Sequence, residues 1–228
     1  ARSGAQVLGE PAAGYLSHPG YAALPKAPYR YQEMLGVIWR ENPSCYLQEG
    51  EQAVLLAALM ETDNAGRPLI DAWSSRSGLS ADAWLEKLFE ATVIPFYHLL
   101  CRYGVALIAH GQNVTLVMKD YVPQRIFLKD FQGDMRLVDE DFPQAQSLPE
   151  QVKAVTARLS ADYIIHDLQT GNFVTVLRFI SRLTLQSGVS ETRFYQILAG
   201  VLHRYMAAHP ELAERFATFD LFKPQIIR

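Results

Sequence analysis

Apolar residues between positions 80 and 104 recur at the spacing of one helix face. In ADAWLEKLFEATVIPFYHLLCRY they include positions 85, 88, 89, 96 and 99, which is the pattern of an amphipathic helix. Ser80 can cap the first turn, and Gly104 can end the last one. Pro95 lies inside the pattern and lacks a backbone N–H, so we expect a kink there.

Shorter apolar runs indicate strands. MLGVIW (34–39) and AVLLAALMET (53–62) are bounded by the turn signals ENP and DNAGRP, and we expect both to be buried strands. After the helix come VALIA, the polar string HGQN, VTLVM, the turn KDYVPQ and RIFLK, which predicts strand, loop, strand, turn and strand. Residues 1–35 mix Gly, Pro and aromatic residues without periodicity, which indicates a winding segment with short elements.

From Leu148 onward the pattern becomes helical. Five segments have helical spacing and start at Ser, Asn or Pro, as helices often do. They are PEQVKAVTARL, SADYIIHDL, NFVTVLRFISRL, SETRFYQILAGVLHRYMAAH and PELAERFATF. We therefore predict an α+β fold: residues 1–147 form a small, mainly antiparallel sheet with a packed helix, and residues 148–228 form a C-terminal helical bundle.

Composition narrows the function. The 228 residues carry a net charge of −3 with both signs spread along the chain, which gives no reason to expect nucleic acid or an anionic membrane as a partner. Two cysteines, Cys45 and Cys101, cannot build a disulfide framework or a four-thiolate metal or iron–sulfur site, so we expect a reducing, cytoplasmic setting. No apolar run has the roughly 18 residues of a membrane span.

The two ends predict a fragment. The chain begins at Ala1 without an initiator Met and stops at Arg228, directly after PQII. A trypsin-like cut within a longer protein would leave such an end. Exposed apolar faces on the C-terminal helices would then pack on the missing part or on a second copy in a homodimer.

Two polar clusters interrupt the strands, HGQN at 110–113 and DFQG at 130–133. A hairpin brings the outer ends of its strands together, so Asn113 and Asp130 should lie close in space. His110 can pair with a phosphate or carboxylate, Gln112 and Asn113 offer amide groups, and Asp130 is a hard oxygen ligand for Mg²⁺ that carries phosphates. Either cluster alone is commonly structural, but both together at hairpin spacing favour a phosphate and metal site.

Basic residues near this hairpin are candidates for contacts with phosphates or a substrate. Arg125 and Lys129 lie on or beside the second strand, although Lys129 should point to the face opposite Asp130. Arg40 follows an apolar run and can reach a ligand from a loop, or form a salt link at a strand end. His166 with Asp167 is a weaker second polar site, for which a hydrogen bond between helices is the more common explanation.

No GxSxG, Walker A or HExxH string is present, so hydrolase, P-loop and zincin chemistries have no motif support. A small-molecule kinase of the aminoglycoside or choline type has a similar layout of His-Gly-Asp, Asn, hairpin and Asp. Such a kinase needs a catalytic Asp where this chain has Gln112.

The chain resembles the C-terminal half of the NRPS-independent siderophore synthetases over essentially its whole length. The strings AHGQN and KDFQG are typical of that family, and VLGEPAAGYLSHPGYAAL, APYRYQEMLGVIWRENP and LSADYIIHDLQTGNFVTVLRFIS also resemble it. The resemblance implies a palm-like antiparallel sheet. It also implies an ATP- and Mg²⁺-dependent ligase that activates a citrate carboxylate as an acyl-adenylate and joins it to an amine. The flanking strings point to a member whose amine is N6-acetyl-N6-hydroxylysine.

By this resemblance His110 touches the activated carboxylate and the α-phosphate, Gln112 and Asn113 hold the nucleotide phosphates, and Asp130 holds Mg²⁺. Further nucleotide and carboxylate contacts come from the family's N-terminal half, which this chain lacks. We therefore expect the chain to be inactive alone. A related non-enzymatic or reductase-like protein remains a third class, but its reductases use a cysteine cluster that two cysteines cannot supply.

Overall fold

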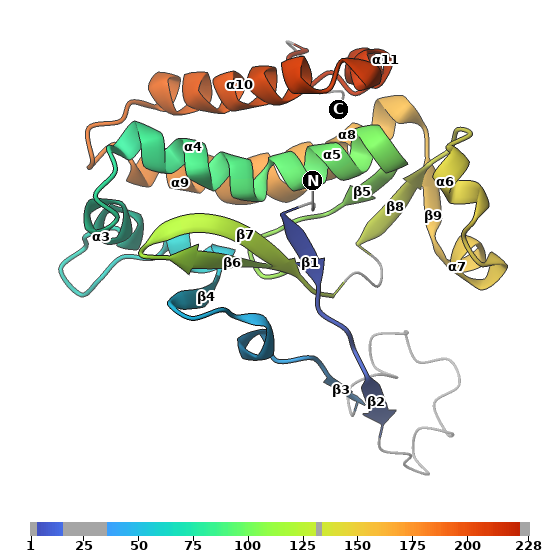
Figure 1. Cartoon of the computed structure of the whole chain (residues 1–228), viewed down its shortest axis with the longest axis horizontal. Coiled ribbons are helices and arrows are strands. Elements are labelled where there is room, and N and C mark those ends of the chain that lie inside the picture. The colour runs from blue at the N-terminus through green and yellow to red at the C-terminus, as the bar shows by residue number, and fades with distance from the viewer. Residues whose placement is uncertain (1–3, 16–35, 131–133, 224–228) are drawn as a thin grey trace, which may run out of the picture.

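The computed structural model describes residues 4–15, 36–130 and 134–223 (Figure 1). In this part of the chain helices and strands are both abundant, which confirms the predicted α+β class. None of its helices is long and apolar enough to cross a membrane.

The central sheet has the strand order β1-β7-β6-β4. Its strands are β1 (Ala5–Val7), β4 (Glu51–Leu55), β6 (Val114–Lys119) and β7 (Val122–Leu128). The predicted hairpin is β6 and β7, and its turn is only two residues, Asp120 and Tyr121, both with positive φ, as a twisted hairpin requires. The sheet is mainly antiparallel, but β1 joins β7 in parallel.

The predicted long helix covers this sheet. It consists of α4 (Ala81–Thr92) and α5 (Ile94–Tyr103), with the break at Val93 just before Pro95. Ser80 caps α4 through Ala83 N, and Gly104 ends α5 in the left-handed conformation, as predicted. In Figure 1, α4 and α5 form a layer between the sheet and α10 (Glu191–Ala208).

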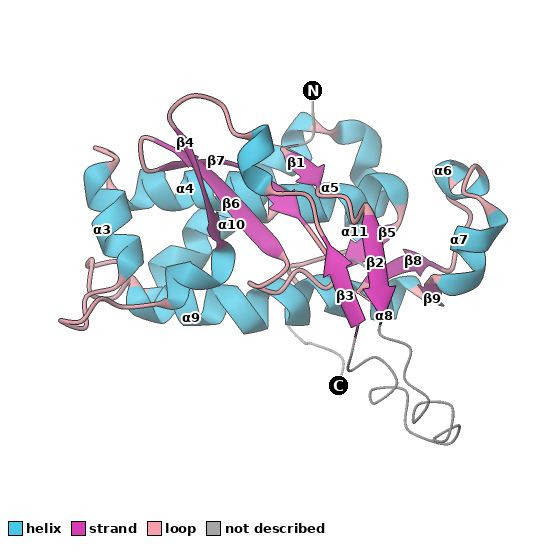
Figure 2. Ribbon diagram, turned by 90° about the horizontal axis from the view of Figure 1, so that it is seen from below, coloured by secondary structure: helices cyan, strands magenta, loops and turns pink. Residues whose placement is uncertain are grey.

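The core lies between these layers and runs across the expected boundary at residue 147. Leu88 and Phe89 of α4 are completely buried, and the Phe89 ring meets Phe194 of α10 edge to face at 5.0 Å. Viewed from below, β6 and β7 cross over the helical layer (Figure 2).

A second sheet also joins the two predicted regions. It contains β5 (Val105–Leu107), β8 (Met135–Val138) and β9 (Ala157–Leu159) in the order β5-β8-β9. Strand β9 lies in the segment predicted to be wholly helical, and it pairs with β8 in parallel. Non-local pairing of this kind leaves no local signal in the sequence.

The other α-helices among the described residues are shorter than α4, α5 and α10. They are α3 (Leu69–Arg76), α6 (Pro143–Gln146), α7 (Glu150–Val155), α8 (Ala161–Leu168), α9 (Arg178–Leu183) and α11 (Ala213–Thr218). The described residues also form three 3-10 helices, η1 (Pro43–Tyr46), η2 (Leu56–Met60) and η4 (Pro210–Leu212), and one π-helix, η3 (Gln169–Leu177). The π-helix continues directly from α8, which the periodicity did not predict.

The two predicted buried strands are only partly right. Residues 36–39 form β3 (Gly36–Trp39), paired with β2 (Ala12–Tyr15), but Val37, Ile38 and Trp39 are about half exposed. The two strands form a ribbon that projects from the main sheet (Figure 1). In the run 53–62, β4 ends at Leu55 and η2 follows, because the chain turns there to place Leu56 and Leu59 in the core.

Candidate active site

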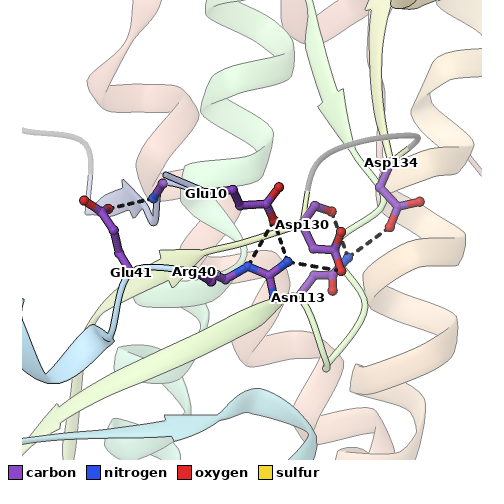
Figure 3. A network of polar contacts seen from close by, with 7 residues as sticks. Glu10, Arg40, Glu41, Asn113, Asp130 and Asp134 are labelled. Atoms are coloured by element: carbon purple, nitrogen blue, oxygen red, sulfur yellow. Dashed lines mark hydrogen bonds and ion pairs between the residues drawn. The ribbon is translucent and has the colours of Figure 1, made fainter. Parts of the chain in front are cut away.

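The ends of the hairpin converge as the sequence predicted. Val114 pairs with Leu128, and Lys129 N donates to Asn113 O at 3.1 Å. Asn113 therefore lies directly beside Asp130 (Figure 3). The two clusters are brought to one place by the β6–β7 register alone.

Asn113 is the centre of this arrangement. Its side chain is almost fully buried, and Nδ2 donates both to the main-chain oxygen of Asp130 at 3.2 Å and to Oδ2 of Asp134 at 2.9 Å. The two amide hydrogens are thus directed at oxygen atoms of the loop that follows β7 (Figure 3). Asn113 therefore holds Asp130 and Asp134 in place, and its contact with a phosphate stays a prediction.

Asp134 is a site residue that the sequence reasoning missed. Its Oδ2 lies 3.5 Å from His110 Nε2, and both side chains are about one-third exposed. The available signal was the second carboxylate of the string DFQGD, four positions after Asp130. Residues 131–133, the rest of the predicted DFQG cluster, lie outside the described residues.

Arg40 enters the site from the loop after β3. Its Nη2 lies 3.6 Å from Asp130 Oδ2 and 2.5 Å from Glu10 Oε1, and its Nε also donates to Glu10 at 3.1 Å. The guanidinium thus bridges two carboxylates from distant parts of the chain (Figure 3). The salt link predicted for Arg40 is therefore present, whereas its contact with a ligand stays a prediction.

The neighbouring Glu41 fixes the same segment. Its Oε2 accepts from Gly9 N at 2.7 Å. Hydrogen bonds from the Tyr46 hydroxyl and from Gly9 N hold the pKa of the Glu41 carboxyl below its usual value. Together, Glu10 and Glu41 attach the segment after β1 to the segment after β3, beside the site.

Main-chain contacts hold the HGQN loop. Gly111 O accepts from Ala57 N at 3.0 Å, and a Cβ on Gly111 would lie 3.0 Å from Ala57 Cα and N. Only glycine allows η2 to approach so closely. Asp130 has φ of +63°, an uncommon conformation for a residue other than glycine that is typical of functional loops.

Three predicted residues lie outside this network. The Arg125 guanidinium donates to Glu51 at 2.6 Å and to Tyr46 O at 3.1 Å, and it stacks over the Phe127 ring. Its hydrogen bonds are therefore with β4 and η1 of the sheet region. Gln112 is exposed in the loop next to Asn113, and Lys129 is half-buried next to Asp130, so both stand beside the site.

The carboxylates of this site suit a cation that phosphate groups bind at the same time. Asp130 and Asp134 present two carboxylates around Asn113, while no group of three or more His, Cys, Asp or Glu able to hold a metal occurs among the described residues. Mg²⁺ typically takes one or two protein carboxylates together with phosphates and water. The residues fit a Mg²⁺ that arrives with a nucleotide, but not a metal held by the protein alone.

The weaker polar pair, His166 and Asp167, lies on α8. His166 Nε2 and Asp167 Oδ2 are buried, and neither has a hydrogen-bond partner within the described ranges. Burial raises the pKa of the Asp167 carboxyl. The interhelix hydrogen bond favoured from the sequence is therefore not seen for these two atoms.

Two family profiles match the chain. The profile of the IucA / IucC family matches residues 1–61, and a profile described as ferric iron reductase FhuF-like transporter matches residues 82–228. Aerobactin synthase of Escherichia coli is 67% identical over 227 residues, which are 100% of this chain and 39% of that protein. Because this alignment includes both matched regions, a FhuF-like region is part of a siderophore synthase.

Solved structures agree. Aerobactin synthetase IucC from Klebsiella pneumoniae matches with a TM-score of 0.89 at 64% identity, over 100% of this chain and 40% of that one. Petrobactin biosynthesis protein AsbB from Bacillus anthracis matches with a TM-score of 0.84 at 25% identity, over 97% of this chain and 38% of its own. The fold is thus that of siderophore synthetases.

The chain belongs to the IucA/IucC family, the siderophore synthetases that its motifs predicted. It spans about 40% of the length of the relatives it matches. The match leaves the small-molecule kinase without support. An iron–sulfur centre also lacks its ligands within this chain, because Cys45 is exposed in η1 and Cys101 is buried in α5.

Proposed function

We propose that this chain forms one wall of the active site of an ATP-dependent ligase that makes a hydroxamate siderophore of the aerobactin type. The ligase joins a citrate or citryl carboxylate, activated as an acyl-adenylate, to the amine of a hydroxylated lysine derivative such as N6-acetyl-N6-hydroxylysine. Support comes from the 67% identity to a protein named aerobactin synthase. Such an ATP-using enzyme would work in the cytoplasm.

The observation that carries the proposal is the convergence of His110, Asp130 and Asp134 around Asn113. Adenylation of a carboxylate brings negative charge on the phosphates against a negatively charged nucleophile. An imidazole and a cation supported by two carboxylates can offset this repulsion in fixed positions. His110 would contact the reacting carboxylate and the α-phosphate, with Gln112 and Lys129 beside the other phosphates.

Asp130 would hold Mg²⁺, and Asp134 is its natural second partner. When bound, Mg²⁺ would neutralise phosphate charge. Arg40 now neutralises Asp130 across 3.6 Å, so it would become available to a substrate carboxylate once a cation takes over that task. Arg125, held by Glu51, would support the sheet instead of contacting phosphate.

The test is ATP–pyrophosphate exchange by the full-length protein with a citrate derivative. Removal of the imidazole in His110→Ala, or of one metal-binding charge in Asp130→Asn, should lower exchange by about 100-fold or more, as expected for loss of a group that stabilises transition-state charge. Asp139→Asn, an exposed aspartate after β8, is the matched control. Wild-type exchange in both site variants would disprove the assignment.

The products distinguish the reaction class. Mass spectrometry should detect AMP, pyrophosphate and an amide-linked product when ATP, Mg²⁺, a citrate derivative and the hydroxylated lysine are supplied. Formation of ADP and a phosphorylated product would instead indicate a kinase. The 228-residue chain alone should show no exchange, and citrate-dependent exchange by it would contradict the half-site proposal.

A further inference from the structure

The π-helix η3 packs against the strand end that leads into the HGQN loop. A Cβ on Gly171 would lie 3.0 Å from Ala109 N and from Ile108 Cα. Such a distance is tighter than nine in ten real Cβ contacts, and the atoms met are main-chain atoms, so glycine suits this close approach. The helical region and the loop are therefore in main-chain contact immediately before His110.

The next residue makes a directed contact to the same place. Asn172 is fully buried, and its Nδ2 donates to Ala109 O at 3.2 Å. Ala109 O belongs to the peptide group whose nitrogen is that of His110. The orientation of this peptide therefore sets the direction in which the His110 side chain leaves the backbone.

Main-chain hydrogen bonds also hold the loop, and one of them is made by the nitrogen of the same Ala109–His110 peptide group. His110 N donates to Ile108 O, Asn113 N donates to His110 O, and Ala57 N donates to Gly111 O, each at 3.0 Å. The Ala109 carbonyl is held from a different direction, by the π-helix. Asn172 thus supplies the contact from the helical region to the loop that carries His110.

The arrangement carries two costs that simple packing does not explain. Asn172 Oδ1 is buried with no hydrogen-bond partner in the described part of the chain, and buried unsatisfied groups of this kind are rare. The helix is also wound as a π-helix at this point, a less favourable form that is frequent at functional sites. The wider turn allows both Gly171 and Asn172 to be buried against the loop.

We propose that Gly171 and Asn172 are positioning residues for His110, which act through the Ala109–His110 peptide group. The proposal rests on the proposed function, because it assumes that His110 contacts the reacting groups. An apolar side chain in place of Asn172 would fill the space but would leave the Ala109 carbonyl without its donor, so that the peptide group is held only through His110 N. The loss should therefore appear in the rate of adenylation and not in the binding of ATP.

The test compares Asn172→Asp, Asn172→Ala and Gly171→Ala in the full-length protein by ATP–pyrophosphate exchange. Each should lower kcat by about 10- to 100-fold, the effect of misplacing a reacting group by about 1 Å, with KM for ATP changed less than about twofold. Thr175→Ala is the matched control, because Thr175 bonds to Gly171 O within the same π-helix and is exposed. It should keep the wild-type kcat.

The pH profile separates positioning from a merely structural role. Asn172→Asp keeps the size of the side chain, but its ionised carboxylate cannot donate to Ala109 O, whereas the protonated carboxyl group can. The kcat of Asn172→Asp relative to wild type should therefore recover as the pH falls, and that of Asn172→Ala should not. A general loss of stability would lower both variants together and without this pH dependence.

Outcomes for the two proposals differ. If His110→Ala retains exchange, the proposed function fails. If His110→Ala abolishes exchange while folded Asn172→Ala and Gly171→Ala keep the wild-type kcat, the positioning proposal is overturned. Should Asn172→Ala not fold, Asn172→Ser, which retains a short donor, takes its place: a wild-type kcat for both it and Asn172→Asp at neutral pH would also overturn the proposal.

Discussion

The side-chain amide of Asn113, just before β6, donates to the carboxylate of Asp134, just before β8, across 2.9 Å. This bond joins the central sheet to the smaller one at the site. The same nitrogen also reaches the main-chain oxygen of Asp130. One buried side chain therefore fixes the Asp134 carboxylate and the Asp130 main chain relative to the hairpin.

Removal of this amide should be costly for stability. In Asn113→Ala, the oxygen atoms of Asp130 and Asp134 lose a donor that is itself almost fully buried, so the free energy of unfolding should fall by about 1–3 kcal/mol. Urea denaturation at pH 7 measures the change. Gln112→Ala, the exposed neighbour, should stay within about 0.5 kcal/mol of wild type, and an equal effect of the two substitutions would contradict the central role of Asn113.

Gly104 should tolerate alanine far less well than Gly66. Both glycines have positive φ, +66° and +77°, so alanine brings a similar backbone strain of about 1–2 kcal/mol to each. At Gly104 the new Cβ would also lie 2.7 Å from the Phe142 ring, whereas at Gly66 nothing lies within 4 Å. Thermal unfolding should show the extra loss of about 1–3 kcal/mol only in Gly104→Ala.

The contrast disappears if the Phe142 ring simply moves aside. Gly104→Ala and Gly66→Ala would then show equal losses. That result would mean that Phe142, just before α6, does not pack tightly against Gly104 at the end of α5.

Local signals explain most of what the sequence could predict. Ser80, Pro95 and Gly104 act within one turn of where they stand, so the α4–α5 unit was predicted with its ends and its break. The hairpin followed from alternating strands around a turn. Its register then brought Asn113 to Asp130 without any knowledge of the rest of the fold.

Features that depend on distant contacts were not predictable in this way. The run ending at Trp39 is apolar, but nothing in its own residues shows that β3 pairs only with β2 and remains exposed. Asp134 and Glu10 became site residues only when β8 and the segment after β1 were placed in space. The basic character of Arg125 suggested phosphate, yet Glu51 across the sheet holds it.

The two cysteines should differ sharply in reactivity. Burial raises the pKa of the Cys101 thiol to about 12, and the side chain is 1% exposed, so the thiolate that reacts is absent at neutral pH. Cys45 is exposed. When the native chain is treated with an aromatic disulfide reagent at pH 7.5, one equivalent of the reagent's thiolate should be released quickly. A second equivalent should be released only when the chain is unfolded.

Cys45→Ser is the control for this measurement and should abolish the fast release. Rapid labelling of Cys101 in the folded Cys45→Ser variant would show that α5 opens from the core. Mass spectrometry of tryptic peptides identifies which thiol has reacted.

His98 should make stability depend on pH. Burial, the nearby His209 and Arg102 lower the pKa of the His98 imidazole, and its Nδ1 lies 2.6 Å from the Tyr205 hydroxyl. The unfolded chain therefore binds this proton more readily than the folded one. Its contribution to stability is present above the unfolded pKa of about 6.5 and is lost as the pH falls toward the lower folded value.

In His98→Gln, the free energy of unfolding should accordingly depend less on pH between about 7 and 5 than in wild type. Urea denaturation at several pH values measures the slope. An unchanged slope in the variant would mean that the folded protein accepts the proton on His98 without penalty.

The parallel pairing of β1 with β7 has a consequence for the order of assembly. Ala5 pairs with Ile126, about half the chain away, and β7 has its own antiparallel partner β6 beside it in sequence. The hairpin can form quickly from local contacts, whereas β1 must wait until a very long loop closes. On the ribosome, β1 emerges well before its partner strand and remains an unpaired edge until β7 has been made.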